Sequence, residues 1–214
     1  MSRAEVADKI DPVDKGGVRG FVHHPAKPNG QGLVLTHGAG SDCAAPLLVA
    51  VANAFAAAGL VVLRCDLEFR QKRPKGPPFP AAAAADRESL RKALSLLKEF
   101  ASGPLFLAGH SYGGRQASML ASEDQVLAAG LLVLSYPLHP PNKPDQLRTA
   151  HFAKLRTPSL FVCGTADAFG STGEIQAALK LIPASTQLVS IEGAGHDLKK
   201  GRFNMAPIVS ALIG

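Results

Sequence analysis

A serine, an aspartate and a histidine follow three separate apolar runs of this chain, in that order. Ser111 lies in G-H-S-Y-G over residues 109–113, Asp167 follows the run 159–163, and His196 follows a run that ends at Ile191. A serine hydroxyl becomes a good nucleophile only when a base removes its proton, which imidazole can do near neutral pH while a carboxylate fixes its tautomer. These residues predict attack of Ser111 on a carbonyl, with His196 as base and Asp167 as its partner.

The setting of Ser111 matters more than the letters of the G-x-S-x-G pattern, which is a weak signal alone. The pattern lies between an apolar run, 104–108, and a segment with helical periodicity, 111–122. In such a strand-turn-helix the backbone is so tight that a Cβ on a flanking residue would strike it, hence the glycines. The turn exposes the serine hydroxyl and directs the N–H of Tyr112 at negative charge forming beside it.

The aspartate and the histidine each have a structural alternative. His196 in E-G-A-G-H-D over residues 192–197 could be an ordinary surface-loop histidine, and Asp167 could serve an Asx-turn or cap the next helix. Asp197 is a poorer partner because a residue adjacent to the histidine cannot easily turn its carboxylate onto that ring. The order Ser, Asp, His matches that of serine-hydrolase triads built on α/β sheets, which favours Ser111, Asp167 and His196.

A second donor for an oxyanion is expected in the glycine-rich stretch H-G-A-G over residues 37–40, which follows the apolar run 32–36. Ala39 is the candidate, since the loop after an early strand supplies this N–H in such sites. Gly38 and Gly40 are candidate pocket residues because small residues let the backbone approach a substrate. His37 is expected to pack beneath the loop, and a plain glycine-rich turn is the alternative.

The elements that must position these residues alternate between short apolar runs and longer helical patterns. Strands are predicted at 18–23, 32–36, 60–64, 104–108, 131–135, 159–163 and 187–191, and helices at 46–58, 81–100, 111–122, 172–181 and from about 200, with a surface loop at 69–80. Continuous apolar strands between helices predict an α/β fold: a mostly parallel, doubly wound sheet with helices on both faces. Ligands bind beyond the carboxyl ends of such strands, where the candidate residues lie.

Composition favours one domain, over residues 1–214, since 46% of the 214 residues are hydrophobic. The formal charge of +6 could attract an anionic partner, but the basic residues lack interleaved aromatics, so we expect solvated surface and no nucleic acid. Three scattered cysteines, an N-terminus without an apolar signal region and the lack of a long apolar run predict a cytoplasmic protein without a membrane partner.

The chain resembles the α/β-hydrolase-like family of testis-expressed protein 30 and its bacterial relatives, which is distantly similar to the dienelactone hydrolases. The resemblance spans nearly the whole chain and is most specific at L-T-H-G-A-G (35–40), G-H-S-Y-G-G-R (109–115), S-Y-P-L-H-P-P (135–141) and L-F-V-C-G-T-A-D (160–167). It implies the α/β-hydrolase fold with a minimal cap and a triad of Ser111, Asp167 and His196. It implies little about substrate. Some eukaryotic members look like partners in chromatin-associated complexes, so the resemblance by itself does not imply catalysis.

We therefore expect a serine hydrolase of carboxylesterase type that cleaves a small ester, thioester or related acyl substrate through an acyl-enzyme, with water as second substrate. No metal or organic cofactor is expected. The alternative is a catalytically silent scaffold that uses the basic loop 70–75 to bind an acidic partner.

Three further residues are candidates for the pocket. Arg115 could hold an anionic substrate or make a structural bond to a neighbouring loop, and Tyr136 and His139 could line the acyl pocket or stiffen the short cap.

Overall fold

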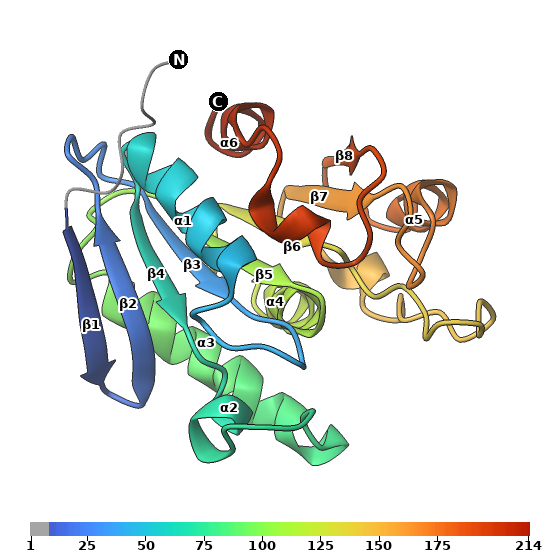
Figure 1. Cartoon of the computed structure of the whole chain (residues 1–214), viewed down its shortest axis with the longest axis horizontal. Helices are drawn as coiled ribbons and strands as arrows, with labels where there is room; N and C mark the ends of the chain where they lie inside the picture. The colour runs from blue at the N-terminus through green and yellow to red at the C-terminus, as the bar shows by residue number, and fades with distance from the viewer. Residues whose placement is uncertain (1–8) are drawn as a thin grey trace.

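The computed structural model of the chain describes residues 9–214, so the expectation about the N-terminal signal region falls partly outside it. An eight-stranded sheet runs through these residues in the order β1-β2-β4-β3-β5-β6-β7-β8 (Figure 1). The strands are β1 Lys9–Lys15, β2 Val18–His24, β3 Gly32–Thr36, β4 Val61–Cys65, β5 Leu105–His110, β6 Gly130–Leu134, β7 Ser159–Gly164 and β8 Thr186–Ile191. The six strands β3 to β8 are parallel to one another, while β2 pairs antiparallel with both of its neighbours, β1 and β4.

Helices cover both faces of the sheet, which confirms the doubly wound prediction. They are α1 Pro46–Ala57, α2 Glu68–Lys72, α3 Ala83–Leu97, α4 Tyr112–Glu123, α5 Thr172–Leu179 and α6 Ala206–Ile213, with 3-10 turns η1 Pro80–Ala82, η2 Phe152–Lys154 and η3 Leu198–Gly201. One apolar layer packs α1 and α6 against the sheet, and a second packs α3, α4 and α5 against the other face (Figure 1). The central strands β3 to β7 are thus buried on both sides, as their continuous apolar sequences require.

Two local sequences explain where helices begin. Proline occupies the start of α1, where its missing N–H has no helical partner to lose. Ser171 caps α5 by accepting the Glu174 N–H, and the Glu174 carboxylate accepts in return from the Ser171 N–H. None of the helices described in residues 9–214 is long and apolar enough to cross a bilayer.

Two parts of the sequence prediction were wrong. Strand β1 was missed because its burial is low and Pro12 interrupts it; it survives as the edge strand, where a missing N–H is tolerated. The predicted loop 69–80 contains α2, which is fixed by a distant contact: the Phe69 N–H donates to Asp86 Oδ1 at 2.9 Å. Arg70, assigned to a basic surface loop, is only 4% exposed.

Candidate active site

The turn from β5 into α4 holds Ser111 in a left-handed backbone conformation, with φ 50° and ψ −117°. Non-glycine residues rarely adopt this region, and where they do the strain usually serves a site. Glycine is required around the turn: a Cβ on Gly109 would come within 2.5 Å of the Gly113 backbone, and one on Gly113 within 2.5 Å of the His37 carbonyl. The turn therefore presents the Ser111 side chain at the carboxyl end of β5, as the sequence predicted.

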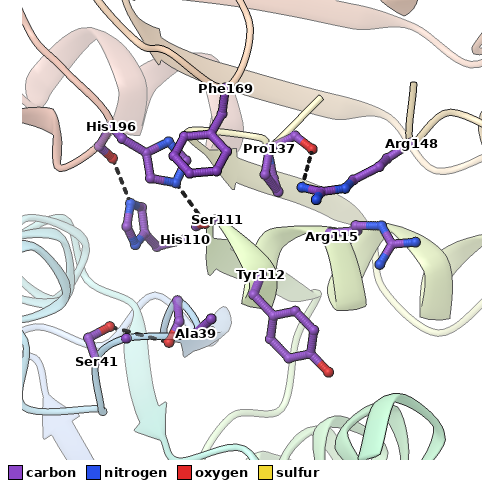
Figure 2. Close-up of a pocket in the computed structure, with 12 residues that line it drawn as sticks. Ala39, Ser41, His110, Ser111, Tyr112, Arg115, Pro137, Arg148, Phe169 and His196 are labelled. Atoms are coloured by element: carbon purple, nitrogen blue, oxygen red, sulfur yellow. Dashed lines mark hydrogen bonds between the residues drawn. The ribbon is translucent and has the colours of Figure 1, made fainter. Parts of the chain in front are cut away.

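The loop after β8 brings His196 to this serine. The distance from His196 Nε2 to Ser111 Oγ is 2.7 Å, and the distances from His196 Nδ1 to the Asp167 carboxylate oxygens are 2.8 and 3.0 Å. An ionised carboxylate accepts hydrogen bonds only, so Nδ1 carries the proton and Nε2 has its lone pair directed at the serine hydroxyl (Figure 2). The three residues predicted to work together thus form one connected hydrogen-bonded chain.

Asp167 also fills the structural role that was its alternative. Its Oδ1 accepts the backbone N–H of Phe169 at 2.9 Å, as in an Asx-turn, while its side chain is only 2% exposed. The same carboxylate therefore both shapes the loop after β7 and orients the imidazole of His196.

Two residues that sequence reasoning missed hold the His196 ring and backbone. His110 donates from Nε2 to the His196 carbonyl at 2.8 Å (Figure 2), and burial lowers the pKa of His110 to about 4, which keeps it neutral. The ring of Phe169 lies against the imidazole with centroids 4.2 Å apart. In the sequence, only the position of His110 next to Ser111 and of Phe169 near Asp167 pointed to these two residues. Their contacts with His196 join segments that are far apart in the chain.

The loop after β3 places Ala39 and Gly40 along the wall of the same cleft. Neither the Ala39 N–H nor the Tyr112 N–H donates to another backbone carbonyl of the described chain, which leaves both amides free for an oxyanion. The buried Arg70 fixes the loop from behind, donating from Nη2 to the Ala39 carbonyl at 2.9 Å and from Nε to the Ser41 carbonyl at 2.9 Å.

His37 lies beneath this loop, where we expected it. The Leu67 N–H donates to its Nε2 at 3.1 Å, so its Nδ1 carries the proton and donates to the Gly38 carbonyl at 2.8 Å. Burial lowers the pKa of His37, and both ring nitrogens are occupied, so it has no free position for proton transfer.

The cleft above Ser111 has a volume of about 520 Å³ and is lined by Gly38, Ala39, Gly40, Ser41, His110, Ser111, Tyr112, Arg115, Pro137, Arg148, Phe169 and His196. The predicted pocket residues Gly38, Gly40 and Arg115 are in this lining. Between β6 and β7 the chain forms only the short turn η2, consistent with a minimal cap.

Tyr136 and His139 do not line the cleft, which corrects the prediction for both. Tyr136 is 2% exposed, packs against the rings of Phe152 and Phe161, and its hydroxyl donates to the Arg148 carbonyl. His139 is 6% exposed, and its Nδ1 bonds to the carbonyl of Pro140. The alternative, that they stiffen the short cap, fits these contacts.

Several solved structures have a similar fold. An alpha-beta serine hydrolase homologue from Coxiella burnetii has a TM-score of 0.72 at 16% identity, over 96% of this chain and 95% of that one. A dienelactone hydrolase from Anabaena variabilis has 0.70 at 20% identity, over 95% and 94%. A Xanthomonas campestris protein, described as a member of the a/b serine hydrolases without lid, has 0.71 at 16% identity, over 95% and 90%.

The TM-scores of 0.70 to 0.72 over nearly the whole chain show that the protein shares its fold with these structures. A family model described as alpha/beta hydrolase domain matches residues 29–205, most of the chain. The protein has the α/β-hydrolase fold and belongs to this alpha/beta hydrolase family.

Proposed function

We propose that this protein is a serine hydrolase of carboxylesterase type, which cleaves a small ester, thioester or related acyl substrate through an acyl-enzyme on Ser111. The observation that carries the proposal is the continuous chain from Ser111 Oγ to His196 Nε2 at 2.7 Å and from His196 Nδ1 to Asp167 Oδ2 at 2.8 Å. A hydroxyl, an imidazole and a carboxylate in this order are what an activated serine requires.

In the proposed first step, Ser111 Oγ bonds to the substrate carbonyl carbon while its proton passes to His196 Nε2. The carbonyl electron pair moves onto oxygen, and the N–H groups of Ala39 and Tyr112 stabilise that oxyanion. The pair then re-forms the carbonyl, the bond to the leaving alcohol or thiol breaks, and the imidazolium protonates the leaving atom. Asp167 holds the imidazolium and keeps its own charge.

In the proposed second step, water takes the place of the departed alcohol or thiol. His196 removes a water proton, hydroxide oxygen bonds to the acyl carbon, and the bond to Ser111 Oγ breaks as the imidazolium returns the proton to it. The carboxylic acid leaves and the serine is regenerated. No cofactor takes part in this sequence.

The open cleft supports small or surface-presented acyl groups as substrates, because the 520 Å³ space has no long covering segment. We further propose that the protein belongs to the testis-expressed protein 30-like group of α/β-hydrolases and that it is cytoplasmic. Three free and buried cysteines support a reducing compartment.

The scaffold alternative loses part of its basis, because its basic loop was to include Arg70, and that side chain is buried behind the residue 39–41 loop.

The test is hydrolysis of p-nitrophenyl acetate and butyrate, together with labelling by a fluorophosphonate. The wild type should turn over and label, Ser111→Ala should do neither, and Ser102→Ala, an exposed serine before β5, should match the wild type. If the wild type neither labels nor turns over these esters, the hydrolase proposal is wrong and the scaffold alternative takes its place.

A further inference from the structure

Two arginines line the catalytic cleft together with Ser111. Arg115 lies on α4, one helical turn after the serine, and Arg148 lies in the segment between β6 and η2. Figure 2 shows both arginines on the side of Ser111 opposite His196, with the Arg148 guanidinium directed at the Pro137 carbonyl and the Arg115 guanidinium directed away from Ser111. The cleft therefore has a proton-transfer end and a cationic end.

Neither arginine is neutralised by the protein. Three other partly buried arginines of residues 9–214 each have a carboxylate partner: Arg19 with Asp66 at 3.0 Å, Arg87 with Glu123 at 3.0 Å and Arg91 with Asp124 at 2.6 Å. The buried Arg70 instead donates to backbone carbonyls. Within residues 9–214, no carboxylate oxygen lies within salt-bridge distance of Arg115 or Arg148. The two cations thus face the cleft without an anion.

The hydrogen-bonding capacity of the pair is also mostly unused. The Nε of Arg115 is buried and has no acceptor among the described residues, so the structural bond that was its alternative role is not present at this atom. Arg148 donates from Nη1 to the Pro137 carbonyl at 3.1 Å, and the backbone carbonyl of Arg148 accepts a hydrogen bond from the Tyr136 hydroxyl. The backbone of Arg148 is therefore fixed, while most of its donors remain available.

The two guanidinium groups supply the positive charge at this end of the cleft. Burial and the adjacent Arg115 lower the pKa of Arg148, and burial together with Arg115 and Arg87 lowers the pKa of His151 to about 4, so His151 adds no charge. Two guanidinium groups in one partly buried region repel each other, and an anion between them would remove that cost. Guanidinium forks match the two oxygens of a carboxylate.

We propose that Arg115 and Arg148 form a subsite for a carboxylate of the substrate, so that the substrate is a carboxylate-bearing ester, thioester or amide. This rests on the proposed function of Ser111. The pair would orient the substrate by its charged end while its scissile carbonyl lies at Ser111, and a substrate without this charge would lose that orientation.

The test compares substrates that differ only in the charge. The p-nitrophenyl monoesters of succinic, glutaric and adipic acid are each paired with the same ester carrying its distal carboxyl group as a methyl ester, and kcat/KM is measured after subtracting the rate with Ser111→Ala. For at least one chain length the wild type should prefer the charged member by about tenfold or more, since hydrogen bonds to charged groups are strong.

The variants then assign the preference to the two arginines. Arg115→Gln and Arg148→Gln should each lower kcat/KM for the charged member by about 10- to 100-fold, and for the methyl-capped member much less. Arg156→Gln, an exposed arginine outside the cleft, should keep the wild-type ratio. If a glutamine variant fails to fold by circular dichroism, the lysine variant replaces it, because lysine keeps the charge and loses the fork.

The subsite is refuted if the wild type turns over charged and capped esters equally at every chain length, or if the preference survives in both variants. Failure of the hydrolase proposal is distinct, because then neither p-nitrophenyl butyrate turnover nor fluorophosphonate labelling occurs. In that case saturation-transfer NMR with monomethyl adipate decides: signals in the wild type that vanish in the Arg115→Gln, Arg148→Gln double variant support the subsite, and no wild-type signal refutes it.

Discussion

Mild acid should destabilise this protein because three of its histidines are held neutral in the folded state. Burial lowers the pKa of His23, His110 and His151 to about 4, from an ordinary value of 6.5. The unfolded chain therefore binds more protons than the folded one between these pH values, and stability falls as pH decreases from 6.5 toward 4. Above pH 6.5 the full stability is present.

His23 shows the structural reason. Its ring is fully buried, and its Nε2 accepts a hydrogen bond from Arg64 Nε at 2.6 Å. A proton on Nε2 would replace this bond by two N–H groups facing each other, beside a guanidinium charge. Between pH 7 and pH 5 each such histidine should cost about 2 kcal/mol, and the three together about 6 kcal/mol. That is comparable to the whole stability of a typical domain, about 5–15 kcal/mol.

Urea unfolding followed by far-ultraviolet circular dichroism at pH 7 and pH 5 measures this, since the chain has no tryptophan for fluorescence. His23→Gln keeps an acceptor for Arg64 and cannot be protonated, so its loss of unfolding free energy on acidification should be smaller by about 2 kcal/mol. His24→Gln, a less buried neighbour on β2, should show the wild-type loss. Equal stability of the wild type at both pH values, or an equal loss in His23→Gln, would refute the reasoning.

Three further variants test the site and its support. Asp167→Asn should lower kcat about 10³- to 10⁴-fold with an intact fold by circular dichroism, because an amide N–H favours the wrong imidazole tautomer; activity near wild type would contradict the triad. Gly113→Ala should lower Tm by several degrees, since its Cβ would lie 2.5 Å from a backbone oxygen, while Gly173→Ala, in open space on α5, should not. Arg70→Gln should lower kcat about tenfold, because it removes the hydrogen bonds that hold the residue 39–41 loop, and it should slow fluorophosphonate labelling in parallel. Unchanged labelling kinetics would argue that other contacts hold this loop.

The sequence predicted well which three side chains lie together, because each follows an apolar strand. Parallel strands end at one edge of the sheet, so Ser111, Asp167 and His196 could be assigned from residue type and order alone. Buried strands such as β3 and β7, in which every residue is buried, carry the strongest pattern.

What the sequence could not predict depends on contacts between distant segments. Helix α2 forms in a proline-rich stretch because Asp86 accepts the Phe69 N–H, and Arg148 reaches the cleft because Tyr136 turns into the core and holds its carbonyl. The same turn of Tyr136 explains why it was wrongly predicted as a pocket residue. Side-chain direction in a segment without periodic structure has no local signature.

The hydrogen bond from His110 to the His196 carbonyl closes a ring. The path runs from Ser111 Oγ through the imidazole and backbone of His196 to the His110 side chain, and returns to Ser111 across one peptide bond. Ser111 and His196, 85 residues apart in sequence, are therefore members of one small hydrogen-bonded ring. Because this ring links Ser111 to His196 by a path outside the sheet, we expect that transplanting the site into another scaffold requires His110 as well as Ser111, Asp167 and His196.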